Sequence, residues 1–231
     1  MIEFYDYTVI LTYLSLLSAT TGIVVALSGG GHPYYGCFFL LFSGLCDAFD
    51  GKVARTKIGR TRAEMDFGIQ IDSLSDLVAF GVLPTCIGTA LIRVSPLIQA
   101  ALAGISIPWH IAAGKFLLHA ILVLYSLAAM IRLAYYNVSE HDRQEHESGA
   151  RTHYLGLPVT SAALIFPLVL LFQYLIPKDI TLVYLGTAVV TGILFLTPFR
   201  IRKVGLKGIL IMVGIGAVEF LLLVLWKVIC R

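Results

Sequence analysis

Four aspartates lie near the ends of two consecutive apolar segments of this sequence. Asp47 and Asp50 are three residues apart near the end of one segment, and Asp72 and Asp76 are four residues apart near the start of the next. Residues at these spacings share one face of an α-helix. Because the connection between the segments is short, we expect two antiparallel neighbouring helices whose four carboxylates converge at one depth.

Converging carboxylates repel one another, and the penalty grows near a low-dielectric environment. Bound divalent cations would offset this repulsion. Carboxylate oxygens suit Mg²⁺, Mn²⁺ or Ca²⁺ and suit zinc or copper poorly, because those metals prefer histidine or cysteine. Four carboxylates can bridge two ions about 3.5–4 Å apart, an arrangement used in phosphoryl chemistry. Since carboxylates inside membranes are normally functional, we predict that Asp47, Asp50, Asp72 and Asp76 serve a function, and Mg²⁺, Mn²⁺ or Ca²⁺ are the ions that suit them.

The residues around the aspartates fit a phosphate-bearing substrate. Gly51 and Ala54 are small and lie on or beside the aspartate face, which leaves room for a ligand against the backbone. Arg55 offers a planar guanidinium to phosphate oxygens. Gly68, four residues before Asp72, removes a side chain where the two helices would meet. The two glycines and the alanine are also typical packing residues of membrane helices, so each has a purely structural alternative.

The composition is that of a membrane protein. Of the 231 residues, 58% are hydrophobic and 13% are charged, and the mean hydropathy is +0.87. The net charge of +3 is too small to suggest nucleic acid as a partner. The four cysteines have no paired spacing, which argues against a disulfide or a zinc site. We expect a single membrane-embedded domain over 1–231, with a core at 1–198 and an additional helix in 199–231.

A helix that spans a bilayer needs about 20 mostly apolar residues. Seven stretches meet this condition within a few residues: 7–28, 34–55, 67–92, 115–137, 158–176, 180–197 and 207–228. We therefore predict an all-α, polytopic membrane helix bundle of about seven transmembrane helices, with six to eight as the range. The apolar stretch 95–110 contains Pro96 and Pro108. We interpret it as a partly buried surface segment, although it could form an eighth span.

Basic residues indicate which loops face the cytoplasm. With residues 1–6 inside, the inner loops hold Lys57, Arg60, Arg62, Arg143, Arg151, Arg200, Arg202 and Lys203. The outer loops hold little beyond Arg93 and Lys178. This asymmetry predicts an integral membrane protein with the aspartates at the cytoplasmic face, in a bacterial or archaeal inner membrane.

Two stretches of the chain resemble the signature of the CDP-alcohol phosphatidyltransferases: Asp47-x-x-Asp50-Gly51-x-x-Ala54-Arg55 and Gly68-x-x-x-Asp72-x-x-x-Asp76. The chain departs from that pattern in one place. Twelve residues separate Arg55 from Gly68, where the family pattern has about eight. The extra residues fall in TKIGRTRAEMDF (56–67), so we expect a longer loop and unmoved helix faces.

Within that family the chain most resembles the phosphatidylserine synthases. This likeness rests on IDSLSDLVAFGVLP (71–84), RLAYYNV (132–138) and GLPVTSAA (156–163). It implies an enzyme, a CDP-diacylglycerol–serine O-phosphatidyltransferase, that transfers the phosphatidyl group from CDP-diacylglycerol to the hydroxyl of L-serine and releases CMP. It also implies a two-metal mechanism, in which Asp47, Asp50, Asp72 and Asp76 hold two divalent cations, Mg²⁺ or Mn²⁺. It further implies Asp76 as general base and a homodimer among membrane lipids. The asparagine-containing stretch that often begins the family's first helix is absent, and Thr8 and Thr12 are the nearest polar residues.

A zwitterionic serine needs a cation for its carboxylate. Arg132 and Asn137 lie at the cytoplasmic end of the fourth predicted span, at the depth of the aspartates, and we predict that they bind substrate. The alternatives are that Arg132 reaches lipid headgroups and that Asn137 caps the helix end. Arg151 and His153 precede the fifth span at the same face. Glu219, inside the last span, suggests a polar contact to another helix or to a dimer partner.

Three other functions compete with this interpretation. The nearest is the same chemistry with glycerol 3-phosphate, inositol phosphate or a second lipid as acceptor. The phosphorylated acceptors should need a denser cluster of Arg and Lys than we can assign. A divalent-cation transporter would use the aspartates as a permeation site, but it does not account for Gly51, Ala54 and Arg55. A non-catalytic membrane scaffold would tolerate the substitution Asp76→Asn.

Overall fold

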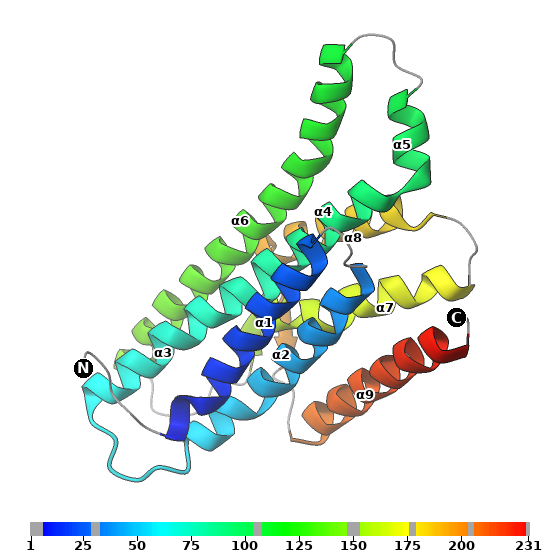
Figure 1. The fold of residues 1–231 in the computed structure, drawn as a ribbon. Coiled ribbons are helices and arrows are strands. Elements are labelled where there is room, and N and C mark those ends of the chain that lie inside the picture. Colours follow the sequence, from blue (N-terminus) through cyan, green and yellow to red (C-terminus); the bar gives the residue numbers. More distant parts are fainter. Residues whose placement is uncertain are drawn as a thin grey trace.

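Helices make up most of the protein. The computed structural model describes residues 7–28, 33–103, 108–146, 153–175, 179–202 and 206–229. Each predicted span corresponds to a helix or to a run of helices. Their bounds are α1 (Ile10–Leu27, preceded by the 3-10 turn η1, Tyr7–Val9), α2 (Pro33–Ala54), α3 (Arg62–Asp76), the π-helical segment η2 (Leu77–Val82), α4 (Leu83–Val94), α6 (Pro108–His146), η3 (Val159–Ser161), α7 (Ala162–Leu175), α8 (Thr181–Leu196) and α9 (Leu206–Ile229). The predicted all-α helix bundle is confirmed (Figure 1).

Within the part of the chain that the structure describes, three helical stretches are long and apolar enough to cross a membrane. By length and composition these are Tyr7–Leu27, Arg62–Val94 and Ala113–Asp142. Two shorter apolar helices cover Val159–Phe172 and Thr181–Leu196. The chain therefore carries the helices of a membrane protein, and the number of about seven crossings stays a prediction.

The helix that carries Asp72 and Asp76 begins earlier than expected. Thr61 caps it, because the Glu64 N–H donates to Thr61 Oγ1 at 3.2 Å and the Thr61 N–H donates to Glu64 Oε2 at 2.7 Å. Such a reciprocal pair satisfies two backbone donors that a helix start leaves without partners. Residues 62–67, which we expected in the loop, are therefore the first turns of α3, and the extra residues lengthen a helix more than a loop.

The fourth predicted span is also longer than expected. α6 begins at Pro108 and runs to His146, well into the polar stretch that we predicted to be a loop. Before it, α5 (Pro96–Ala103) has eight residues and buries Ile98 and Leu102. A helix of that length extends only about 12 Å, against about 30 Å for a bilayer core. The stretch thus forms the expected partly buried segment, and α5 does not make an eighth span.

A small two-stranded sheet was not predicted. β1 (His153–Leu155) pairs antiparallel with β2 (Arg200–Arg202), with Tyr154 opposite Ile201. Directly after β1, Gly156 has φ +77° and its N–H donates to the Phe199 carbonyl at 2.6 Å. A Cβ at Gly156 would lie 3.0 Å from the Thr197 carbonyl oxygen, so glycine suits this turn both in conformation and in space. This two-stranded sheet connects the segment before α7 with the segment after α8.

Short polar and small side chains bring α1 against α2. Ser43 Oγ donates to the Ser15 carbonyl at 3.0 Å, and Ser18 Oγ donates to the Phe39 carbonyl at 2.8 Å. A Cβ added to Gly22 would lie only 2.7 Å from the Phe39 Cβ, so glycine permits this approach. The two helices lie side by side in Figure 1. This contact positions the C-terminal part of α2, which carries the first two aspartates.

The last helix lies at the edge of the bundle. α9 contacts α2 and α7, and Figure 1 shows it beside α7. Glu219 in α9 is 3% exposed, and neither of its carboxylate oxygens has a hydrogen-bond partner among the described residues. The polar contact that we expected for Glu219 is therefore not formed within that part of the chain.

Candidate functional site

Three of the four motif aspartates converge where α2 ends and α3 runs past it. Carboxylate oxygens of Asp47, Asp50 and Asp72 all lie within 4.8 Å of one another. That spacing allows one oxygen from each to reach a common hard cation, which takes oxygen ligands from carboxylates. The convergence predicted from the i,i+3 and i,i+4 spacing is thus observed for these three residues.

Asp76 lies one helical turn further along the same helix. It is 7% exposed, and its carboxylate is close enough to interact electrostatically with those of Asp47, Asp72 and Asp50. It is not part of the three-carboxylate cluster that the described residues form. Its roles as fourth metal ligand and as base therefore stay predictions.

Two hydroxyl side chains fix the rotation of α3 around its axis. Ser75 Oγ donates to the Thr12 carbonyl of α1 at 3.2 Å. On another side, Asn137 Nδ2 of α6 donates to Ser73 Oγ at 2.7 Å. Because Ser73 and Ser75 flank the aspartate positions, these contacts hold Asp72 and Asp76 in a defined direction.

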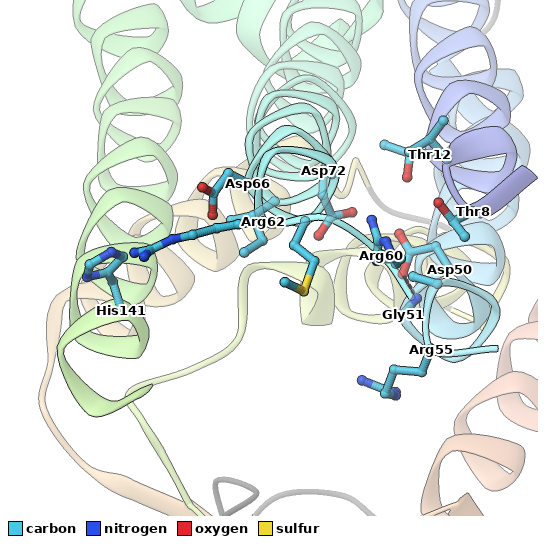
Figure 2. A pocket seen from close by; sticks show the side chains of 15 residues that line it. Thr8, Thr12, Asp50, Gly51, Arg55, Arg60, Arg62, Asp66, Asp72 and His141 are labelled. Atoms are coloured by element: carbon cyan, nitrogen blue, oxygen red, sulfur yellow. Dashed lines mark hydrogen bonds between the residues drawn. The ribbon is translucent and has the colours of Figure 1, made fainter. Parts of the chain in front are cut away.

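A cavity of about 710 Å³ opens at the carboxylate cluster (Figure 2). This volume lies in the range of about 300–1,000 Å³ that is usual for small-molecule sites. It is lined by Asp50, Asp72, Gly51, Ala54, Arg55, Gly68, Thr8, Val9, Thr12, Arg60, Arg62, Met65, Asp66, Ile69 and His141. Four of the residues that we predicted to bind substrate, Gly51, Ala54, Arg55 and Gly68, are therefore in its wall, together with Thr8 and Thr12.

The cavity wall also contains residues that we did not predict as part of the site. Arg60 comes from the loop directly before α3, Arg62 is the first residue of α3, and His141 comes from the extension of α6. In Figure 2, Arg60 lies toward Asp50 and Asp72, whereas Arg62 extends toward His141. The pair of arginines around Thr61 was visible in the sequence. The position of these arginines in the cavity wall was not predicted, because the loop between α2 and α3 is shorter in the structure than we expected.

Arg60 explains the glycine at position 68. A Cβ on Gly68 would lie 2.9 Å from Arg60 Nη2, so the missing side chain makes room for this guanidinium rather than for a second helix. At Gly51, in contrast, an added Cβ would meet the Arg55 guanidinium at an ordinary 3.8 Å. The structure therefore gives Gly68 a steric role within the protein and leaves the space beside Gly51 for a ligand.

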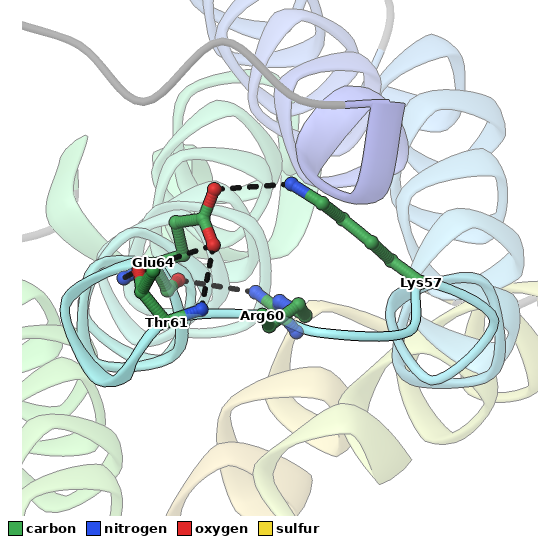
Figure 3. A network of polar contacts seen from close by, with 4 residues as sticks. All are labelled: Lys57, Arg60, Thr61 and Glu64. Atoms are coloured by element: carbon green, nitrogen blue, oxygen red, sulfur yellow. Dashed lines mark hydrogen bonds and ion pairs between the residues drawn. The ribbon is translucent and has the colours of Figure 1, made fainter.

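The basic loop between α2 and α3 is held down by polar contacts (Figure 3). Lys57 Nζ forms an ion pair with Glu64 Oε1 at 3.0 Å, and Arg60 Nη2 donates to the Glu64 carbonyl at 3.1 Å. The Arg60 Nε is buried and has no hydrogen-bond partner among the described residues. A buried donor of this kind in a cavity wall fits an anionic ligand.

The predicted acceptor residues occupy different surroundings. Arg132 is 5% exposed, so it does not reach lipid headgroups; its Nε donates to the Leu157 carbonyl at 3.1 Å, and it is not in the cavity wall. Asn137 lies inside α6, which continues to His146, so the alternative that it caps a helix end is wrong. The side chains of Arg151 and His153 lie outside the part of the chain that the structure describes.

Comparison with known proteins places this site in a family. The family model for CDP-alcohol phosphatidyltransferase matches residues 8–198, which include all four motif aspartates. The chain is 28% identical over 167 residues to the CDP-diacylglycerol–serine O-phosphatidyltransferase of Helicobacter pylori strain J99, covering 71% of this chain and 59% of that protein. It is 33% identical over 153 residues to the archaetidylserine synthase of Methanothermobacter thermautotrophicus, covering 65% of this chain and 52% of that protein.

A eukaryotic protein shows a similar degree of likeness. The CDP-diacylglycerol–serine O-phosphatidyltransferase of Saccharomyces cerevisiae is 29% identical over 163 residues, covering 66% of this chain and 50% of that protein. The chain thus spans between half and three fifths of the length of these relatives. Because the family match covers most of the chain and includes the carboxylate cluster, this protein belongs to the CDP-alcohol phosphatidyltransferase family.

Proposed function

We propose that the protein is a phosphatidylserine synthase, which transfers the phosphatidyl group of CDP-diacylglycerol to the hydroxyl of L-serine and releases CMP. One observation carries the proposal. Two carboxylates of the cluster that can hold divalent cations, Asp50 and Asp72, lie in the same cavity wall as three arginines that can bind phosphates. The relatives named as serine phosphatidyltransferases support serine as the acceptor.

The acidic residues fit a hard divalent cation, because all the clustered donors are carboxylate oxygens. Asp47, Asp50 and Asp72, with Asp76, would hold two such ions, Mg²⁺ or Mn²⁺. When bound, these ions would neutralise charge on the pyrophosphate and on the departing CMP.

The other residues in the wall would bind and orient the nucleotide-linked lipid. Gly51 and Ala54 leave an uncovered strip of α2 against which the cytidine can lie. Arg55 and Arg60 offer planar guanidinium groups to the phosphate oxygens, and Arg60 has a buried N–H left for that purpose. The acyl chains would leave the cavity sideways into the surrounding lipid.

Asp76 is proposed as the general base. A serine hydroxyl attacks poorly while it keeps its proton, so a carboxylate within hydrogen-bond reach must accept it. The serine oxygen then forms a bond to the phosphorus of the phosphatidyl group. The bond between that phosphorus and the bridging oxygen breaks, and CMP leaves with the electron pair. The enclosed position of Asp76, one turn from Asp72, supports this role.

Arg132 and Asn137 stay our proposed acceptor residues, with different supports. Asn137 reaches α3 beside Asp72 through Ser73, so a small movement would bring its amide to a bound serine. Arg132 lies at the turn of Gly156 and Leu157 and is not among the residues that line the cavity. We also propose that the enzyme is an integral membrane homodimer with its cavity at the cytoplasmic face, which the basic loop around Lys57 supports.

One observation favours a second candidate acceptor. We expected phosphorylated alcohols to need a denser group of basic residues than the sequence indicated, and the cavity contains Arg55, Arg60 and Arg62. With Arg55 and Arg60 assigned to the CDP-linked lipid and Arg132 to the serine carboxylate, Arg62 is left as a cation for a phosphate on the acceptor. The same chemistry with glycerol phosphate or inositol phosphate is therefore the alternative.

The acceptor can be decided by direct competition. Purified protein would be given CDP-diacylglycerol and Mn²⁺, with L-serine, glycerol 3-phosphate or inositol phosphate as the alcohol, and CMP release would be measured. We expect serine to give the fastest release, and addition of a chelator to stop it. Release that is no faster with serine than with the phosphorylated alcohols would remove the serine assignment, and metal flux into sealed vesicles without nucleotide would indicate a transporter.

A further inference from the structure

The helix that carries Asp72 and Asp76 changes its winding directly behind them. The π-helical segment η2 follows Asp76, and the Leu83 N–H donates to the carbonyl of Val78, five residues earlier. One extra residue in a turn rotates the remainder of the helix by about 100° relative to an unbroken α-helix. The π-helical segment η2 therefore determines the direction of the two aspartate side chains relative to the face of α4 that packs in the bundle.

Pro84 accounts for the interruption. In a regular α-helix the carbonyl of Phe80 would accept a hydrogen bond from the N–H of residue 84, but proline has no N–H. Phe80 is fully buried, so its carbonyl needs another donor from within the protein.

Tyr125 of α6 supplies that donor. Its hydroxyl donates to the Phe80 carbonyl at 2.6 Å, and its side chain is 2% exposed. The neighbouring Ser126 donates from Oγ to the Gly81 carbonyl at 3.0 Å. A Cβ on Gly81 would lie 3.3 Å from the Ala129 Cβ, so the glycine lets η2 approach α6 closely. Two consecutive carbonyls of η2 are thus held by consecutive residues of α6.

A second tyrosine makes the same kind of contact further from the site. The Tyr184 hydroxyl of α8 donates to the Pro84 carbonyl at 2.7 Å, and Tyr184 is also fully buried. Both tyrosine rings pack on Phe166, with centroid distances of 5.3 Å for Tyr125 and 4.8 Å for Tyr184. The two contacts differ in their distance from the aspartates: Phe80 is four residues after Asp76, and Pro84 is eight.

We propose that Tyr125, assisted by Ser126, is a positioning residue for the reaction. Its hydroxyl holds the π-helical turn that directs the Asp76 carboxylate toward the carboxylate cluster. Without this donor, the Phe80 carbonyl would have to find another partner, and the turn that precedes it in the chain would shift with it. This inference rests on the proposed function, because that function assigns Asp76 its role in the reaction.

The test compares Tyr125→Phe with Tyr184→Phe in the purified full-length protein. Each variant removes one buried hydroxyl and keeps the ring, so both should lower the thermal midpoint by a similar amount. For Tyr125→Phe we expect kcat for CMP release to fall about 10- to 100-fold, because a partner that orients a reacting or metal-binding group typically has this effect. The KM for CDP-diacylglycerol should change less than about twofold, since the cavity wall is untouched.

A second readout does not depend on turnover. Binding of Mn²⁺ alone, followed by electron paramagnetic resonance, should weaken about tenfold or more in Tyr125→Phe, and should change less than about twofold in Tyr184→Phe. If Tyr125→Phe does not fold, Ser126→Ala tests the same turn through the Gly81 carbonyl, and a smaller loss in the same two quantities is expected.

The outcomes separate this inference from the proposed function. Equal losses of kcat and Mn²⁺ affinity in the two tyrosine variants, or none in Tyr125→Phe, would show that Tyr125 only supports the fold. If instead the unmodified protein forms no phosphatidylserine while Mn²⁺ binding weakens selectively in Tyr125→Phe, the positioning role holds and the proposed reaction does not.

Discussion

Asp76 is enclosed by the bundle, with 7% of its surface exposed, whereas Asp47 and Asp72 are half-buried. Asp72 and its cluster neighbour Asp50 line the cavity, where ions and nucleotide would meet them. A carboxylate held inside a membrane bundle is costly and is normally retained for function. At the scale of the residue, the four aspartates therefore divide into a cluster suited to cations and one enclosed group suited to proton transfer.

Replacement of Asp76 by asparagine tests this division. The amide has the same shape but cannot accept the serine proton, so we expect CMP release to fall about 10²- to 10⁴-fold with the protein still folded. The measurement is CMP release per enzyme, with the gel-filtration profile as evidence of folding. The matched control is Glu219→Gln, the same change at a buried carboxylate in α9, outside the cavity wall, which should keep its activity. Appreciable turnover in Asp76→Asn would remove Asp76 as the base.

At the scale of the element, the C-terminal end of α1 is closed by a side chain from a distant helix. Arg93 at the end of α4 donates from Nη1 to the Leu27 carbonyl at 2.9 Å, and from Nη2 to the Ala26 carbonyl at 3.2 Å. These carbonyls belong to the last turn of α1, which has no further backbone donors and attracts positive charge. The arginine that stood out among the predicted outer loops is therefore a cap for another helix.

Removal of this cap should loosen α1 without touching the cavity. We expect Arg93→Met to lower the free energy of unfolding by about 1 kcal/mol, which is typical for lost hydrogen bonds at a solvent-accessible site. Thermal unfolding in detergent would measure the change, and CMP release at low temperature should stay near that of the unmodified protein. Arg93→Lys keeps the positive charge but loses the planar guanidinium. Its free energy of unfolding should therefore lie between those of Arg93→Met and the unmodified protein. A stability unaffected by Arg93→Met would contradict the capping role.

Asp179 joins α5 and α8 in a similar way. Its carboxylate accepts hydrogen bonds from the Ser95 hydroxyl, from the Leu97 N–H at 3.2 Å and from the Thr181 N–H at 2.9 Å. Partial burial acts to raise the pKa of Asp179, but the hydrogen bonds from Ser95, Thr181 and Leu97 outweigh it and lower the pKa below the ordinary 3.8.

A lowered pKa predicts a stability that depends on pH with a definite sign. The charged carboxylate stabilises the fold fully above its unfolded pKa of 3.8, and this contribution is lost as the pH falls through the lower folded value. Asp179→Asn should therefore unfold at a lower temperature than the unmodified protein at pH 6, and the gap should narrow below about pH 4. Thermal unfolding of both proteins across this range measures the gap. A gap that is constant with pH would exclude the carboxylate charge as its cause.

At the scale of the whole molecule, the predicted membrane orientation places the cavity on the cytoplasmic side of the membrane. The loop between α2 and α3 adjoins the cavity, and Ile58 in this loop is 97% exposed. α5, at the other end of the long α6, contains the exposed Leu97. If basic loops face the cytoplasm, these two positions lie on opposite sides of the membrane.

Cysteine labelling can test this orientation. An impermeant maleimide should modify Ile58→Cys in inside-out vesicles and not in sealed right-side-out vesicles, because the loop is predicted to be cytoplasmic. Leu97→Cys should show the reverse pattern. The unmodified protein is labelled in parallel as the background, because Cys37 and Cys46 are buried but Cys86 is only half-buried. Labelling of Ile58→Cys from the outside alone would invert the predicted topology.

Much of the site could be inferred from local spacing. The i,i+3 and i,i+4 repeats and the short connection predicted four converging carboxylates, and three of them, Asp47, Asp50 and Asp72, form a cluster among the described residues. The boundaries of α3 and α6 were missed because apolar length marks where a membrane helix lies, whereas caps and polar turns decide where it ends.

The sequence by itself determined the helical class, the apolar segments and the face on which the aspartates lie, because these depend on residues close together in the chain. Only the tertiary structure decided which distant groups meet. Gly68 makes room for Arg60, Asn137 holds Ser73, and Tyr125 replaces the donor that Pro84 removes. A buried polar group must be satisfied by whatever donor the packing brings near, and that donor can come from any helix.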